Sequence, residues 1–254
     1  MKITSWNVNS LNVRLPHVLQ WLETHQVDVL ALQELKLDQD KFPIADIVDA
    51  GYQAIWFGQK TYNGVALLYK GEAEDVICGI PNYEDEQRRM IAATINGVRI
   101  INVYCVNGEA IGSAKFEYKQ RWFAALNDFV ASQMQQFKRV VLLGDFNIAP
   151  TDIDVYDAEK WRDKILCSAD ERAWLQQLLS SGLSDSFRLH HPEKVQYTWW
   201  DYRMNMFKRK LGLRIDHILV SEALTAGIQS VEVDEIARSW ERPSDHAPIT
   251  LEVA

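Results

Sequence analysis

The chain has 254 residues, of which 47% are hydrophobic and 24% are charged. This is an ordinary globular composition, and it argues against a disordered chain. No apolar run approaches the roughly 20 residues of a membrane-spanning helix, so we expect no association with membranes. The three cysteines are scattered without a CxxC pair. Their odd number and wide spacing exclude a disulfide framework, disfavour a cysteine-built zinc site and fit a reducing cytoplasm best.

The formal charge is −8 at pH 7, from 27 basic and 35 acidic residues. Such a chain does not coat nucleic acid through bulk positive charge. Local basic segments, or an acidic site that metal ions neutralise, are compatible with this balance. Composition alone therefore permits an enzyme that acts on DNA but does not favour one.

Nine segments have the length and the Val, Ile and aromatic content of β-strands. They cover residues 3–8, 27–34, 53–58, 64–69, 90–95, 98–105, 139–147, 214–220 and 248–253. Three apolar stripes at helical spacing lie between them, and we interpret these as core-facing helices. They cover residues 15–22, 122–137 and 174–179. Pro16 stands where a helix can begin, and Ser168 with Glu171 forms a capping-box pattern before the third helix.

No linker or repeat divides the chain, so we expect a single domain over residues 1–254. Strands interspersed with helices predict an α/β architecture with two sheets packed face to face and helices outside.

Polar side chains stand at the ends of several predicted strands. They are Asn7, Glu34, Asp145, Asn147, Asp216, Asp245 and His246. Taken alone, each favours a turn or a helix cap. On one rim of a sandwich, however, the carboxylates would crowd together and need a cation or shared protons. Oxygen ligands with a histidine nearby suit Mg²⁺ or Mn²⁺ rather than zinc.

Sequence blocks in family order resemble exonuclease III-type apurinic/apyrimidinic endonucleases over essentially the whole chain. The blocks are SWNVNSL at 5–11, LQELK at 32–36, GQKTYNGVALL at 58–68, NVYCVNGE at 102–109, GDFNIAPTDID at 144–154, TWWDYR at 198–203, GLRIDHILVS at 212–221 and ERPSDHAP at 241–248. The GDFN block is shared with the wider metal-dependent phosphodiesterase superfamily, whereas TWWDYR and GLRID are more particular to its DNA-repair branch.

This resemblance implies a four-layer α/β sandwich with two packed mixed β-sheets flanked by helices. It implies a monomer that uses Mg²⁺ or Mn²⁺ to hydrolyse phosphodiesters of double-stranded DNA. The expected reactions are incision 5′ to abasic sites and removal of blocking groups or nucleotides from 3′ ends. Asn7 and Glu34 match metal-binding positions, and Asp245 is close by. The full expected metal-binding set is Asn7, Glu34, Asp145, Asn147, Asp245 and His246.

The resemblance also implies five catalytic roles. Asp145 matches the residue that activates the attacking water, and Asn147 matches its partner in binding the phosphate. Tyr104 matches the tyrosine that faces the scissile phosphate. His246 matches the phosphate-contacting histidine, which Asp216 orients. A carboxylate beside His246 favours the imidazolium form, which can donate to a phosphate oxygen.

The stretch 203–214 is strongly basic and contains no acid. Its basic residues are Arg203, Lys208, Arg209, Lys210 and Arg214, with two methionines and Phe207 interleaved. It is either a solvated loop or a DNA-binding segment whose cations hold phosphates while an apolar side chain wedges into the duplex. The preceding pair Trp199–Trp200 favours the second interpretation. The expected DNA-binding residues are Asn107, Trp199, Arg203, Lys208, Arg209, Lys210 and Leu213.

Substrate choice depends on a pocket that admits a base-free sugar but no intact nucleotide. By resemblance, Trp199 forms its aromatic wall and Leu213 its apolar floor. A side chain as large as Leu166, in the loop ahead of the helix capped at Ser168, would narrow this pocket and favour 3′ termini over internal abasic sites. Alternatively, Leu166 packs under its own helix.

Two other functional hypotheses stay open. The chain could be a superfamily phosphodiesterase that acts on phosphoinositides, sphingolipids or undamaged DNA, although no membrane-facing apolar element stands out. It could also be a non-catalytic DNA-binding or scaffold protein that retains the fold. Such a protein should have lost one of four residues, yet Glu34, Asp145, Asp216 and His246 are all present.

Overall fold

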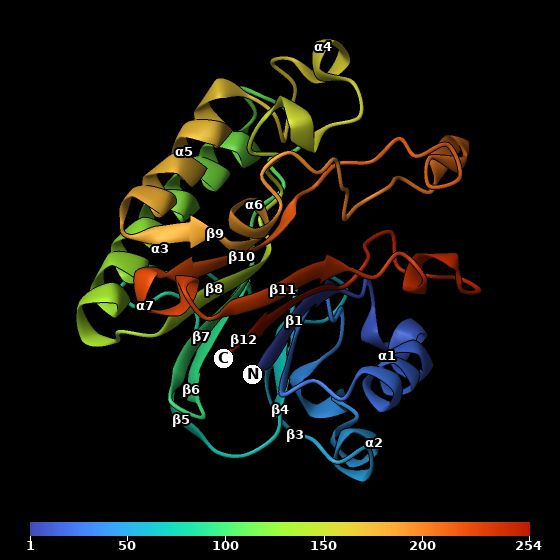
Figure 1. Cartoon of the computed structure of the whole chain (residues 1–254), viewed down its shortest axis with the longest axis vertical. Coiled ribbons are helices and arrows are strands. Elements are labelled where there is room, and N and C mark those ends of the chain that lie inside the picture. Colours follow the sequence, from blue (N-terminus) through green and yellow to red (C-terminus); the bar gives the residue numbers. More distant parts are fainter.

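The computed structural model describes residues 1–254 as two β-sheets packed face to face, with helices on both outer faces (Figure 1). The first sheet contains β1 (Lys2–Asn7), β2 (Val29–Gln33), β3 (Gln53–Phe57), β4 (Val65–Tyr69), β11 (Ile228–Val233) and β12 (Ile249–Val253). The second contains β5 (Ala73–Cys78), β6 (Met90–Ile95), β7 (Val98–Tyr104), β8 (Val140–Asp145), β9 (Leu183–Asp185) and β10 (Asp216–Ser221). Their spatial orders are β11-β12-β1-β2-β4-β3 and β5-β6-β7-β8-β10-β9.

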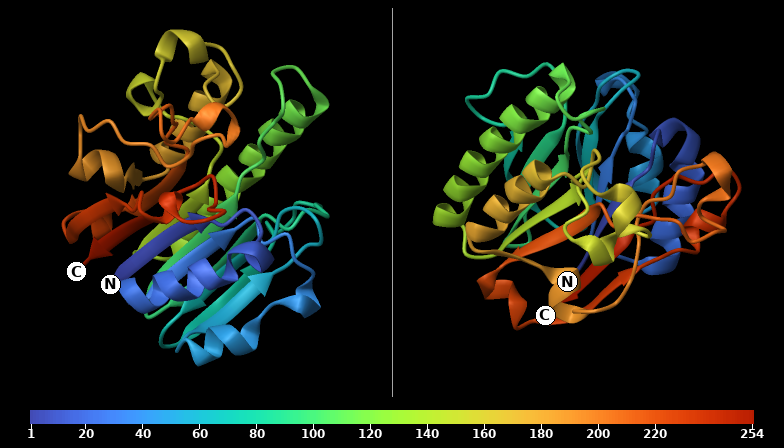
Figure 2. Two further views of the ribbon diagram at one scale, coloured as in Figure 1. Left: turned by 90° about the vertical axis from the view of Figure 1, so that its right-hand side faces the viewer. Right: turned by 90° about the horizontal axis from the view of Figure 1, so that it is seen from above.

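Both sheets are mixed, because each contains one parallel pair, β1–β2 or β7–β8, among antiparallel neighbours. The helices are α1 (Leu11–His25), α2 (Ile44–Asp49), α3 (Ala114–Gln136), α4 (Ala158–Trp161), α5 (Ala169–Ser180), α6 (Ser186–His190) and α7 (Glu222–Thr225). Four short 3₁₀ turns are η1 (Gln39–Lys41), η2 (Asp152–Asp154), η3 (Arg203–Asn205) and η4 (Ala237–Ser239). Seen from above, α3 and α5 lie on one side of the sheets and α1 on the other (Figure 2). This confirms the predicted four-layer α/β sandwich.

Three apolar layers hold the sandwich together. One fills the space between the two sheets, a second joins the second sheet to α3 and α5, and a third joins the first sheet to α1 and α2. Central strands are therefore buried on both faces, which explains why their sequences are continuous apolar runs. None of the helices is long and apolar enough to cross a membrane.

All nine predicted strands are present, but the structure adds β5, β9 and β11. The strands β5 and β11 lie at sheet edges and expose several polar side chains, and β9 has only 3 residues. Apolar runs do not mark such strands, because edge strands carry charge and need no second buried face.

The first helix begins earlier than predicted. It starts at Leu11, and Pro16 lies inside it rather than at its start. Contacts outside the helix fix its start, because Leu11 is fully buried and its N–H donates to the carbonyl of Leu35. Pro16 offers no N–H to the carbonyl of Asn12, but both residues are exposed, so water can replace that bond. The predicted capping box of Ser168 and Glu171 is confirmed at the start of α5.

Candidate active site

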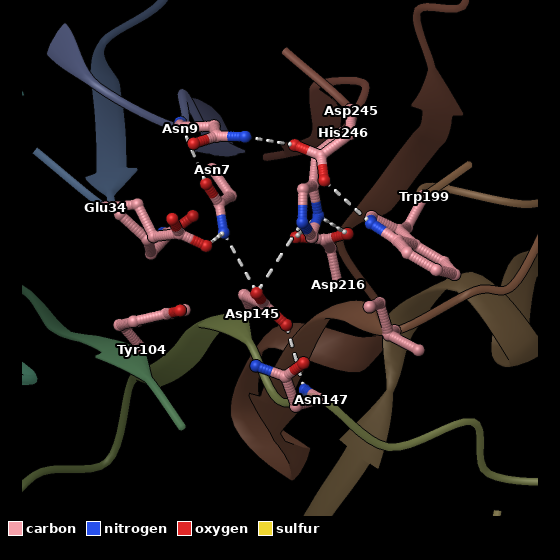
Figure 3. Close-up of polar contacts among 12 residues, drawn as sticks. Asn7, Asn9, Glu34, Tyr104, Asp145, Asn147, Trp199, Asp216, Asp245 and His246 are labelled. Carbon is pink, nitrogen blue, oxygen red and sulfur yellow. Dashed lines mark hydrogen bonds and ion pairs between the residues drawn. The ribbon is translucent and has the colours of Figure 1, made fainter. Parts of the chain in front are cut away.

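Strand register brings the predicted polar residues to one rim of the sandwich. Tyr104, Asp145 and Asp216 are neighbours across β7, β8 and β10. On the first sheet, Asn7 ends β1 and Glu34 follows the parallel strand β2. The parallel pairs end at this rim, whereas β10 and β12 begin there, so their polar ends converge (Figure 3).

The backbone before Asp145 requires glycine. Gly144 has φ +145°, and a Cβ at this position would lie 1.9 Å from the carbonyl oxygen of Val103 on β7. Any side chain would therefore push β8 away from β7 at the point where Asp145 and Tyr104 meet. The glycine of the GDFN block thus serves the close approach of two strands.

A buried ion pair joins His246 to Asp216. The imidazole Nδ1 lies 2.9 and 3.1 Å from the two carboxylate oxygens, and its Nε2 lies 3.7 Å from Asp145 Oδ2. Burial alone would lower the pKa of His246, but the carboxylates of Asp216 and Asp145 raise it to about 10. His246 therefore carries a proton at neutral pH and presents a cation to the rim.

Asp145 is poised as a base. Burial raises its pKa to about 7; His246 opposes this shift, whereas Asp216 and Glu34 add to it. Its Oδ1 accepts from the backbone N–H of Asn147, and its Oδ2 accepts from the amide of Asn7, both at 2.9 Å. A carboxylate that exchanges its proton near neutral pH, in a fixed orientation, has the properties of a general base.

The same rim offers a candidate metal site. Ligand atoms of Glu34, Asp145 and His246 all lie within 4.8 Å of one another. Carboxylate oxygens of Glu34 and Asp145 fit a hard divalent cation, which would offset the crowded negative charge. His246 faces the same space with its proton, which suits it to donate to an anion. Asn7 turns its amide nitrogen to Glu34, at 2.9 Å, so its oxygen faces elsewhere and accepts from the N–H of Asn9.

Asp245 lies beside this group rather than within the close cluster. Its two oxygens accept from Asn9 Nδ2 at 2.9 Å and from Trp199 Nε1 at 3.0 Å. Burial would raise its pKa, but His246 and these two donors lower it. Asp245 is therefore a carboxylate with its own hydrogen-bond donors, and it orients Trp199.

Two amides extend the rim beyond Asp145. Asn107 Nδ2 donates to Asn147 Oδ1 at 3.0 Å, and Asn147 Nδ2 donates to the carbonyl of Cys105 at 3.1 Å. Asn147 adopts φ +51°, a left-handed conformation that asparagine tolerates better than most residues. Burial and the carboxylates of Glu34 and Asp145 raise the pKa of the nearby Tyr104 well above its usual 10, so its hydroxyl remains a donor.

The three residues predicted to form the sugar pocket meet in one apolar cluster. Leu166 and Leu213 are buried in it, and the ring of Trp199 packs against it. Leu166 has φ +73°, which is strained for a branched side chain. Leu175 of α5 belongs to a different cluster, so Leu166 packs with Leu213 and the ring of Trp199 rather than with the core residues of α5.

Most of the basic segment 203–214 lies on the surface. Lys208, Arg209 and Lys210 are exposed, whereas Arg203 pairs with Asp201 on the surface. Met204 is 68% exposed and has the accessibility expected of an inserting side chain.

The structure contradicts the phosphate-binding interpretation for the last cation of the segment, Arg214. Its side chain is fully buried, and its guanidinium pairs with Asp154 at 2.6 Å and with Asp185 at 2.8 Å. Two carboxylates of the protein already neutralise this cation, so it is a structural residue and does not reach DNA.

The rim is also organised by several residues that were not predicted from the sequence. Lys36 Nζ lies 2.8 Å from Glu34 Oε2 and donates to Asn9 Oδ1. The guanidinium of Arg89 lies 4.9 Å from the centre of the Tyr104 ring. Ser244 Oγ donates to the carbonyl of Asn7 at 2.6 Å. Asn9, Lys36 and Ser244 fall inside the blocks that carry the family resemblance, whereas no sequence signal points to Arg89.

Comparison with known proteins agrees with this geometry. Residues 4–246 match the profile of the Endonuclease/Exonuclease/phosphatase family. The chain is 38% identical to exodeoxyribonuclease III of Haemophilus influenzae, over 99% of each chain. A solved structure of the 3′ phosphatase NExo from Neisseria, bound to a product DNA hairpin, is 60% identical with a TM-score of 0.99, covering 100% of this chain and 99% of that one. An AP endonuclease from Archaeoglobus fulgidus is 35% identical with a TM-score of 0.96 and the same coverage. The chain therefore belongs to the endonuclease/exonuclease/phosphatase family.

Proposed function

We propose that this protein is a DNA-repair nuclease that processes 3′ ends and incises 5′ to abasic sites. The observation that carries the proposal is the convergence of Glu34, Asp145 and the His246–Asp216 pair on one rim, with His246 Nε2 3.7 Å from Asp145 Oδ2. The names of its relatives, an exodeoxyribonuclease III, a 3′ phosphatase and an AP endonuclease, support DNA as the substrate. We infer one catalytic domain over residues 1–254 that acts as a monomer in the cytoplasm.

A phosphodiester resists hydrolysis because its anionic oxygens repel a nucleophile and its leaving alkoxide is poor. Mg²⁺ or Mn²⁺ held by Glu34 would polarise a phosphoryl oxygen and neutralise charge on the leaving oxygen. Asp145 accepts a proton from the attacking water. His246 and Tyr104 donate hydrogen bonds to non-bridging oxygens. Asn147 holds the water or a phosphate oxygen with its amide, and no covalent intermediate is needed.

A gel assay tests this function directly. Its substrates are an abasic duplex, a recessed undamaged 3′ end and a 3′-phosphate end, each with Mg²⁺, with Mn²⁺ and with EDTA. We expect metal-dependent cleavage of the DNA substrates. A panel of phosphoinositide and sphingolipid vesicles serves as the contrast. Hydrolysis of a lipid without cleavage of any DNA substrate would contradict the proposal and favour another superfamily phosphodiesterase.

We expect Asp145→Asn to lower the turnover rate by roughly 10² to 10⁴, because the amide keeps the shape of the side chain but cannot accept the proton. Single-turnover rates on the 3′-phosphate duplex measure the loss. DNA affinity and melting temperature, measured in parallel, should stay close to those of the wild type. Near-normal turnover at matched stability would remove Asp145 from the role of base.

If Glu34 holds the metal ion, Glu34→Gln should raise the Mg²⁺ concentration needed for half-maximal rate, because a neutral amide binds the cation less well. Titration of Mg²⁺ at saturating DNA measures this shift. Asp245→Asn is measured alongside, since Asp245 is an expected metal ligand that lies outside the close cluster. A shift in Asp245→Asn without a shift in Glu34→Gln would place the ion at Asp245 instead.

The exposed triplet Lys208, Arg209 and Lys210 is proposed to bind DNA phosphates. Replacing all three by glutamine should lower the slope of log affinity against log salt by about 0.9 for each phosphate that the variant no longer neutralises. Lys138→Gln/Arg139→Gln is the control, because these cations precede β8 at the end away from Asp145. Equal slopes in the wild type and the triple variant would make the triplet ordinary surface charge.

We further propose that Leu166 narrows the sugar pocket and favours 3′-end processing. Leu166→Gly should raise abasic-site incision relative to 3′-end processing, whereas Trp199→Ala should weaken abasic-site cleavage. Both activities are measured on matched duplexes, with Leu178→Ala as a control for weakened core packing in α5. If Leu166→Gly loses both activities in step with its melting temperature, like the control, Leu166 is structural.

A further inference from the structure

A lysine with no exposure to solvent stands behind the phosphate-binding amides. Lys119, on α3, is fully buried, and its ammonium donates to three oxygens. These are the backbone carbonyl of Asn147 at 2.8 Å, the backbone carbonyl of Asn107 at 3.1 Å and Glu171 Oε1 at 2.5 Å. An ammonium has three N–H groups, so all of its donors are engaged. One cation thus fixes the backbone of the two loops whose amides bond to each other on the rim.

The counter-ion of Lys119 is Glu171, which holds a third loop, the one that contains Leu166. Glu171 is fully buried in the first turn of α5, and its Oε1 also accepts from the N–H of Leu166 at 3.0 Å. Its Oε2 accepts from the N–H and the hydroxyl of Ser168 at 3.1 and 2.7 Å. The carboxylate therefore caps α5 and also holds Leu166, the residue proposed to narrow the sugar pocket. The loop after β8 is joined to this one directly, because Ala149 N–H donates to the carbonyl of Leu166 at 2.8 Å.

We infer that Lys119 and Glu171 form a positioning pair for the proposed nuclease reaction. Neither side chain is exposed to the solvent that reaches the rim. The pair acts through Asn107 and Asn147, whose backbone it holds in place beside Asp145, and through Leu166. This inference rests on the proposed function, and it adds two residues that set the geometry of the phosphate site from behind.

The alternative is a purely structural ion pair that braces α3 against α5. A buried pair of this kind need not stabilise a protein, because desolvating the two charges offsets much of their attraction. Burial lowers the pKa of Lys119, and Glu171 counteracts the shift. Removing one partner leaves the other as an unpaired buried charge, which lowers stability. Removing both partners avoids that loss of stability. A double variant therefore separates stability from positioning.

The experiment compares Lys119→Met, Glu171→Gln and the double variant with the wild type. Melting temperature, kcat and KM on the 3′-phosphate duplex, and amide hydrogen exchange are measured for each. Arg99→Met is the control, since Arg99 is another buried cation that joins β7 to α3, through Gln133 at 2.7 Å, away from the rim. We expect Arg99→Met to lower the melting temperature without changing kcat.

We expect the double variant to recover most of the melting temperature lost by Lys119→Met while kcat stays roughly 10- to 100-fold low and KM changes little. Small displacements of positioned groups reduce rates by factors of this size. Amide exchange should rise at residues 105–110 and 146–149 in the double variant but not in Arg99→Met.

Recovery of kcat together with melting temperature would overturn the inference and leave a structural brace. Unchanged exchange in both loops would overturn it as well, whatever the kinetics show. A wild-type protein that cleaves none of the DNA substrates would instead contradict the proposed function. In that case the exchange data still decide whether the pair holds the two loops.

Discussion

Crowding of negative charge at one rim is the constraint on which the rest of the site depends. The carboxylates of Glu34, Asp145 and Asp216 approach one another where water is largely excluded, and repulsion there is strong. Two cations reduce this repulsion by forming ion pairs. His246 pairs with Asp216, and Lys36 pairs with Glu34. Burial raises the pKa of Asp145 toward neutrality, and the negative charges of Asp216 and Glu34 add to this rise. The negative charge that adds to this rise also suits the rim to receive a divalent cation.

Such an arrangement needs a rigid support, and the two sheets supply it. Cross-strand register sets Asp145 directly between Tyr104 and Asp216, and the central strands are anchored by apolar residues on both faces. Rotation or slippage of one strand would turn its polar end residue away from the rim. The chemistry therefore rests on strand ends, which are stiff, while the basic segment and the Leu166 loop extend from them.

The sequence predicts the strand-based part of this molecule well and the rest poorly, for physical reasons. Central strands must be apolar on both faces, so their runs stand out, and acids at their ends are visible as exceptions. Edge strands such as β5 show no such pattern. The burial of Arg214 also cannot be predicted from the sequence, because there it is one of five neighbouring cations. Its burial depends on Asp154 and Asp185, which are distant in sequence and adjacent only in the fold.

Backbone conformation also distinguishes the residues of the polar rim from the loop that contains Leu166. Glu34, Asn147 and Leu166 all adopt positive φ, a conformation that costs free energy in any residue other than glycine. At Glu34 and Asn147 the strained turn aims a polar side chain into the rim. At Leu166 the strained turn instead brings an apolar side chain into the cluster that contains Leu213 and contacts the ring of Trp199. Positive φ therefore serves the polar rim at Glu34 and Asn147, whereas at Leu166 it serves an apolar contact with the ring that Asp245 orients.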